Sequence, residues 1–234
     1  MSRPAQGDLA AWIAPGRAAV LVIDMQVDFA LPTGLLGRAG VDLSAVPAAL
    51  DAAAQLVVAA RKVGVPVVFV GLQTTPNTDS AAWRERVRRL GGDPDAGAAL
   101  CRTGQRGAVF VGPTPGPGET VISKSRYSAF FRTELQDALA ALGVDTLIVC
   151  GLTTECCVDC TVRDAFHLDY HVFVVGDACA AYAPDLHAAA LNSLAINCAI
   201  PIDAADALAA WGVKSVSPPA PPKTARAPSR PGRR

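Results

Sequence analysis

The sequence predicts an α/β fold, a three-layer α/β/α arrangement built on a mainly parallel, Rossmann-like sheet of about six strands. Two observations predict it: apolar runs of strand length recur along the chain, and helix-like stretches lie between them. Strands and helices in alternation give a parallel sheet that is covered by helices on both faces. With 234 residues, of which 51% are hydrophobic, the chain suits one such domain.

Four apolar runs are the main expected strands. Each run is continuously apolar rather than alternating, which is typical of parallel strands that are buried on both faces. In chain order the runs cover residues 18–24, 65–72, 145–151 and 170–177. Residues 120–122, Thr-Val-Ile, add a shorter strand.

The stretches between these runs are rich in Ala and Leu and are the expected helices. They cover residues 43–64, 128–143, 155–169 and 183–197, with a shorter helix near 80–91. Gly64 and Gly143 follow two of them directly, as glycine does at many helix C-termini. Ser128 is the expected N-cap of the second helix, and the remainder of residues 73–118 reads as irregular.

We place one domain at residues 1–214 and expect residues 215–234 to form a disordered tail. That tail is Pro-rich and basic and has almost nothing to bury. Six of the 21 basic residues lie from Lys214 onward, which leaves 15 basic against 21 acidic residues in residues 1–213. A domain with a charge near −6 is a poor candidate for binding nucleic acid, so we expect no such partner.

The sequence shows neither the pattern of a membrane span nor that of a secretory signal. No run of about 18 apolar residues predicts a membrane span, and the N-terminus lacks the basic-then-apolar plan of a secretory signal. The seven cysteines are an odd number, which favours reduced thiols. We therefore expect a cytoplasmic protein with no membrane partner.

Two charged residues follow expected strands. In parallel α/β sheets the active site lies at the carboxyl ends of the strands. Asp24 ends the first apolar run, and a buried carboxylate there is costly unless it is paired or used. Lys124 follows the short strand at 120–122 and would point toward the same crevice. The alternatives are a loop-capping Asp and a solvated Lys.

Cys157 lies just after another strand, where a helix begins near Glu155. Free N–H groups and the helix dipole in a first helical turn favour a thiolate, and the same groups could hold an oxyanion. The adjacent Cys156 competes for this role on geometry alone. Cys157 and Cys160 could instead form a thiol–disulfide redox pair, Cys156 could join them in a zinc site, or the thiols could simply pack in the core.

Three blocks of sequence resemble one family, the isochorismatase-like cysteine hydrolases. The blocks are VLVIDMQVDF (20–29), SKSRYSAFFRTEL (123–135) and VCGLTTECCVDCTVRDAF (149–166). The family includes nicotinamidase, N-carbamoylsarcosine amidase, ureidoacrylate amidohydrolase and biuret hydrolase, and the resemblance spans about residues 18–202.

The resemblance implies a catalytic triad of Asp24, Lys124 and Cys157. It selects Cys157 over Cys156 because the family's nucleophile directly precedes a Val. It further implies a cis peptide before Thr153 and an oxyanion hole built from the N–H groups of Thr153 and Cys157. The implied reaction is hydrolysis of a C–N amide bond in a small carbamoyl, ureido or carboxamide compound, through a thioester and with release of ammonia.

Two departures from the family pattern narrow the reading. Residues 71–83 contain no His, which argues against the metal of nicotinamidases, so we expect no metal and no cofactor. Glu155 stands where relatives usually carry Asn or Asp. A nicotinamidase-like hydrolase, a redox protein and a silent binding scaffold remain as alternatives.

The substrate pocket is read from aromatic side chains near the expected strand ends. The candidates are Phe29, Trp83, Tyr127 and Phe130. Arg126 and Arg163 could serve a substrate carboxylate, although Arg163 lies on the nucleophile's helix and suits a surface pair better. Relatives are commonly oligomeric, so we expect a homo-oligomer, either a dimer or a tetramer.

Overall fold

A computed structural model describes residues 6–214, and every apolar run expected to be a strand forms one. The strands are β1 (Ala18–Ile23), β2 (Val67–Leu72), β3 (Thr120–Lys124), β4 (Thr146–Leu152), β5 (His171–Ala180) and β6 (Ile200–Ile202). Every residue of β1 and β4 is buried. Helices therefore cover both faces at the centre of the sheet, which explains the unbroken apolar runs.

All six strands run parallel, in the order β3-β2-β1-β4-β5-β6. The chain moves outward from β1 to β3 and then returns to β4 on the other side of β1. This reversal makes a topological switch point between β1 and β4, where Ile23 pairs with Gly151. A crevice forms at such a point, outside the carboxyl ends of the strands. The predicted fold class is confirmed.

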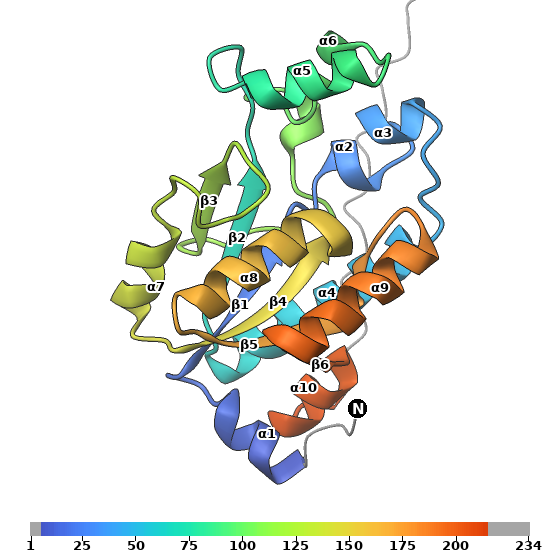
Figure 1. Ribbon diagram of the computed structural model, residues 1–234. Coiled ribbons are helices and arrows are strands. Elements are labelled where there is room, and N and C mark those ends of the chain that lie inside the picture. The colour runs from blue at the N-terminus through green and yellow to red at the C-terminus, as the bar shows by residue number, and fades with distance from the viewer. Residues whose placement is uncertain (1–5, 215–234) are drawn as a thin grey trace, which may run out of the picture.

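The two faces of the sheet are covered by different helices. In Figure 1, α8 and α9 cross in front of the sheet and α4 lies behind it. At the amino end of the sheet, α1 packs against α10, which also contacts α4. The bounds are α1 (Gln6–Trp12), α4 (Val46–Val63), α7 (Leu135–Leu142), α8 (Asp159–His167), α9 (Pro184–Asn197) and α10 (Ala204–Ala210). Gly64 and Gly143 end α4 and α7 in the left-handed conformation, as predicted.

The helix expected from Ser128 is shorter than predicted. Helix α7 begins at Leu135, and residues 128–134 form turns instead. Arg132 has a positive φ of 54°, which interrupts any helix there. Thr161 of α8 accepts a hydrogen bond from the Ala129 N–H, so contact with another helix holds this segment in its turns.

A layer of short helices lies beyond the carboxyl ends of the strands (Figure 1). Its members are α2 (Val27–Ala30), α3 (Leu35–Arg38), α5 (Ala81–Arg89), α6 (Pro94–Ala98) and the 3-10 turn η1 (Arg106–Ala108). Ser80 caps α5 by accepting a hydrogen bond from the Trp83 N–H, and Asp93 caps α6. The pattern predicted α5 alone among them.

No helix within residues 6–214 is long and apolar enough to cross a membrane. The predicted disordered tail at 215–234 lies outside the described residues, so the division at residue 214 stays a prediction.

Candidate active site

Asp24 directly follows β1 and its side chain is fully buried. Its positive φ of 49° turns the chain sharply at the end of the strand. The Leu72 N–H, at the end of β2, donates a 2.9 Å hydrogen bond to Asp24 Oδ1. The neighbouring strand therefore fixes one carboxylate oxygen and leaves the other for a second partner.

Lys124 ends β3 and supplies that partner. Its Nζ lies 2.7 Å from Asp24 Oδ2, and both side chains are fully buried. The same ammonium donates a 2.9 Å hydrogen bond to the Arg126 carbonyl and a 3.3 Å hydrogen bond to Cys157 Sγ. Lys124 thus joins a carboxylate, a carbonyl and a thiol through its three donors.

Cys157 lies in a π-helical turn, Thr154–Val158, that links β4 to α8. Its contact with Lys124 distinguishes it from Cys156, which is partly exposed and has no such bond. Thr153 begins this turn, is buried, and follows a cis peptide bond from Leu152, as the family resemblance implied.

Burial and charge act together on the two titratable partners. Burial alone would lower the pKa of Lys124, but its interactions with Asp24 and Cys157 outweigh this effect and raise that pKa above its usual value. The neighbouring Cys156 thiol, burial and the Asp24 carboxylate raise the pKa of Cys157, against the lowering effect of Lys124. The raised pKa favours the protonated thiol, which a neighbouring base can deprotonate.

Gln26 is a structural support that the sequence reasoning did not single out. Its side chain accepts a 2.8 Å hydrogen bond from the Leu72 N–H and donates to the carbonyls of Leu72 and Ala108, at 3.0 and 2.8 Å. Gln26 therefore ties the end of β2 to the segment above the sheet. The signal available in the sequence was its place two residues after Asp24, and the structure shows Gln26 to be fully buried.

A cavity of about 420 Å³ opens above Cys157. Three of the four aromatic candidates line it, namely Phe29, Trp83 and Tyr127, together with Thr153 and Cys157. A cavity of this size and lining is typical of a small-molecule site.

Of the remaining candidates, Phe130 and Arg163 lie away from this cavity. Phe130 does not line this cavity, and its ring instead stacks on Tyr170 with the centroids 6.0 Å apart. Arg163 pairs with Asp159 at 2.7 Å and bonds Ser193. Arg126 does line the cavity.

Within residues 6–214, no group of three or more His, Cys, Asp or Glu side chains could hold a metal ion.

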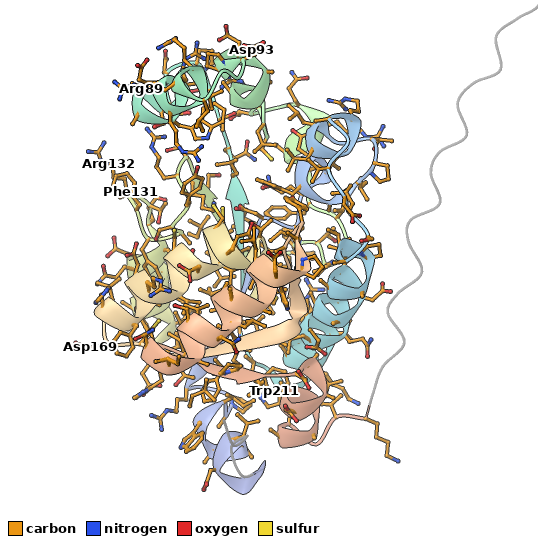
Figure 2. The ribbon with its side chains drawn as sticks, turned by 45° about the vertical axis from the view of Figure 1, so that its right-hand side comes forward. Arg89, Asp93, Phe131, Arg132, Asp169 and Trp211 are labelled. Atoms are coloured by element: carbon orange, nitrogen blue, oxygen red, sulfur yellow. The ribbon has the colours of Figure 1, made fainter. Side chains whose placement is uncertain are left out.

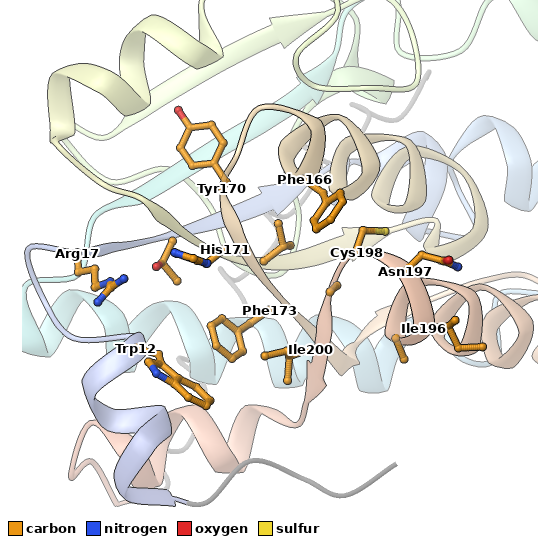
Figure 3. Close-up of a pocket in the computed structure, with 14 residues that line it drawn as sticks. Trp12, Arg17, Phe166, Tyr170, His171, Phe173, Ile196, Asn197, Cys198 and Ile200 are labelled. Atoms are coloured by element: carbon orange, nitrogen blue, oxygen red, sulfur yellow. The ribbon is translucent and has the colours of Figure 1, made fainter.

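A second cavity, of about 540 Å³, lies at the opposite end of the sheet (Figure 3). Its lining includes the first residues of β4, β5 and β6, and Trp12 stacks there on Phe173 with the centroids 6.2 Å apart. Parallel α/β enzymes use the carboxyl edge of the sheet. The cavity above Cys157 is therefore the candidate active site.

Residues 18–206 match the isochorismatase domain, which covers most of the chain. The chain belongs to the isochorismatase family. The predicted family is therefore confirmed, and with it the prediction that the protein is a hydrolase.

Several members of the isochorismatase family are similar to this chain. A ureidoacrylate amidohydrolase, RutB, of Methylobacterium radiotolerans is 35% identical over 87% of this chain and 83% of its own length. The crystal structure of a cysteine hydrolase from Pseudomonas syringae pv. phaseolicola matches with a TM-score of 0.73 at 25% identity, over 86% of this chain and 94% of that one. An N-carbamoylsarcosine amidase from Thermoplasma acidophilum matches with a TM-score of 0.64 at 26% identity, over 80% and 96%.

Proposed function

We propose that this isochorismatase-family hydrolase is a cysteine amidohydrolase. Its substrate would be a small carbamoyl, ureido or carboxamide compound, whose C–N amide bond is cleaved with release of ammonia. The observation that carries the proposal is the buried contact of Lys124 with both Asp24 and Cys157, at 2.7 and 3.3 Å, beneath a cavity. Relatives named as ureidoacrylate amidohydrolase and N-carbamoylsarcosine amidase support this reaction class.

The proposed reaction begins with proton transfer from Cys157 to Asp24. Because the pKa of this thiol is raised, a general base is required, and Lys124 stabilises the thiolate as it forms. The sulfur attacks the carbonyl carbon, and the N–H groups of Thr153 and Cys157 hold the oxyanion. The C–N bond then breaks, and Asp24 returns the proton to the departing ammonia.

The second half of the reaction releases the acyl group. The first half leaves a thioester on Cys157. Water gives a proton to Asp24, and the hydroxide attacks the thioester carbonyl in the same oxyanion hole. The C–S bond breaks, and the proton returns to the sulfur. Both halves use one base, so a single carboxylate is sufficient.

The alternatives fit the site less well. A thiol–disulfide protein that uses Cys157 and Cys160 has no need of a buried Asp–Lys pair, whose desolvation costs several kcal/mol per ion. A metal-dependent, nicotinamidase-like enzyme is not favoured by residues 71–83, which contain no His. A silent scaffold would gain nothing from the same buried charges.

The test is ammonia release from a panel of small amides. The panel contains biuret, N-carbamoylsarcosine, ureidoacrylate analogues, maleamate and nicotinamide, each assayed with and without EDTA. We expect activity in the wild type that survives EDTA and falls to background in Cys157→Ala.

Cys156→Ala is the matched control, because it removes the adjacent thiol and leaves the contact with Lys124. It should keep most of the activity, and circular dichroism should show that both variants are folded. Full activity in Cys157→Ala, or loss only in Cys156→Ala, would refute the proposed nucleophile.

A further inference from the structure

Arg86, on α5, is a cation at the candidate active site without an acidic partner. Helix α5 carries four arginines. Arg88 and Arg89 both pair with Glu85, and Arg84 pairs at 2.6 Å with an aspartate of α6. The guanidinium of Arg86 makes no hydrogen bond or ion pair with any residue in the described part of the chain, and Arg86 lines the cavity above the thiol.

The other charges of this cavity do not neutralise Arg86. Asp79 is the one acidic residue among those that line it. Both of its carboxylate oxygens are engaged by Arg102, at 2.6 and 2.8 Å. Arg126 adds a second cation, whose Nη1 bonds two backbone carbonyls rather than a carboxylate. The wall of the cavity therefore carries an excess of positive charge.

Arg86 and Cys157 share one small space. Both line the same cavity of about 420 Å³. Trp83 fixes the position of α5 over α6, because a Cβ on Gly97 would lie 2.3 Å from its ring. Tyr127 is within electrostatic reach of both groups: burial chiefly raises its pKa, the Cys156 and Cys157 thiols raise it further, and Arg86 lowers it. The thiol and the guanidinium therefore face the same substrate-sized cavity.

We propose that Arg86 binds a carboxylate at the end of the substrate remote from the scissile bond, so that the enzyme prefers carbamoyl or ureido acids to neutral amides. This inference rests on the proposed function, because it assumes that the bound molecule is an amide that is cleaved at Cys157. A guanidinium presents paired N–H donors that match a carboxylate, which makes Arg the side chain suited to this task. A neutral amide would gain nothing from this guanidinium, because Arg86 is exposed and water solvates its charge.

The first experiment does not require a known substrate. Two alkylating reagents, N-chloroacetylglycine and its neutral amide N-chloroacetylglycinamide, differ by one carboxylate charge. In each reaction the sulfur of Cys157 displaces chloride and forms a thioether, which mass spectrometry locates. The measured quantity is the ratio of the acid's rate to the amide's rate, divided by the same ratio for 2-mercaptoethanol.

Arg86→Gln should lower that ratio about tenfold, the size expected for the loss of one charge-assisted hydrogen bond. Arg89→Gln is the matched control, since Arg89 lies on the same helix but at the outer surface and pairs with Glu85 (Figure 2). It should keep the wild-type ratio. An unchanged ratio in Arg86→Gln, or an equal fall in both variants, would overturn the assignment.

The second experiment uses turnover and separates this inference from the proposed function. For a carbamoyl acid that the enzyme cleaves, Arg86→Gln should raise KM about tenfold with kcat little changed, because a remote contact is equal in ground and transition states. The matching neutral amide should be unaffected. If no amide is cleaved while the alkylation ratio depends on Arg86, the amidohydrolase proposal fails and the anion site stands. If acids are cleaved and Arg86→Gln changes neither ratio nor KM, the anion site fails alone.

Discussion

Lys124 illustrates how a single residue ties stability to chemistry. Its ammonium is fully buried beside Asp24. Taking two charges out of water costs several kcal/mol per ion, and their attraction repays this only when the geometry is excellent. A buried pair of this kind is weak evidence for stability. Its contact with a thiol is the reason to assign it to catalysis.

This view predicts opposite effects from single and double substitutions of the pair. Asp24→Ala leaves Lys124 buried without its counter-charge and should lower the free energy of unfolding by about 3–5 kcal/mol. The double variant Asp24→Leu with Lys124→Met removes both charges at similar volume and should recover most of that loss. Urea unfolding followed by circular dichroism measures both values.

Activity is the control for this pair of variants. The double variant should be stable but inactive, because it lacks the base and the cation beside Cys157. If Asp24→Ala unfolds at the same urea concentration as the wild type, Asp24 and Lys124 do not form a buried ion pair.

The sequence led to the expectation that the three triad candidates lie together, as they do in the structure, and it anticipated three of the four aromatic candidates at the cavity but misplaced Phe130 and missed Arg86. Each of the three lies at or after the carboxyl end of a strand in a parallel sheet, so topology alone brings Asp24, Lys124 and Cys157 to one edge. Phe130 was expected at the pocket, yet it lies in a turn whose direction depends on a contact with α8. Arg86 was missed, although four arginines against one glutamate on α5 already left unpaired charge. The catalytic roles themselves remain predictions.

At the scale of elements, length and burial decide which could be predicted. Strands β1 and β4 are buried throughout and read as unbroken apolar runs, so they were found. Strand β6 has three residues, Ile-Pro-Ile, at the edge of the sheet, too few to form a pattern. Helices α2, α3 and α6 have four or five residues each and depend on their packing. Single-turn elements have little intrinsic stability.

Gly151 gives a prediction about the joining of two elements. It lies in β4 with a φ of +139°, and a Cβ there would lie 2.1 Å from the Ile23 carbonyl oxygen of β1. Gly151→Ala should therefore force β1 and β4 apart beneath the active site and destabilise the fold by about 3 kcal/mol. Thermal or urea unfolding measures the loss.

Gly64→Ala is the matched control for this substitution. Gly64 also has a positive φ, of +80°, but nothing lies within 4 Å of a Cβ built on it. Gly64→Ala should lower the free energy of unfolding by only about 1 kcal/mol, the cost of placing Ala in the left-handed conformation. Equal losses in the two variants would show that the close approach of β1 does not matter.

At the scale of the whole molecule, the two ends of the sheet have different surroundings. The carboxyl end is covered by the short helices α2, α3, α5 and α6 (Figure 1), and residues of α2, α5 and α6 line the cavity of the candidate active site. At the amino end, the second cavity is lined by Trp12 and Phe173 (Figure 3), and Trp12 is 37% exposed. The candidate active site lies at the carboxyl end, so the amino end is free for a role other than catalysis.

We propose that the surface around the second cavity joins copies of the chain into a homo-oligomer, either a dimer or a tetramer. Phe166 of α8, Ile196 of α9 and Ile200 of β6 all line its cavity, and they are 48%, 71% and 40% exposed. Large apolar side chains gathered at one exposed place mark protein interfaces more often than isolated ones do. Light scattering after size exclusion should give a mass of two or four chains, and Ile196→Lys should lower it toward one chain, because a charge buried in an apolar contact is costly.

Leu90→Lys is the matched control for Ile196→Lys. Leu90 is 69% exposed, as prominent as Ile196, but it follows α5 in the layer above the other end of the sheet. Its substitution should leave the mass unchanged, and unaltered circular dichroism should show that both variants are folded. A monomeric wild type would refute the oligomer. An oligomer that persists in Ile196→Lys would place the interface on another face, and dissociation in both variants would show that added charge, not the position, is responsible.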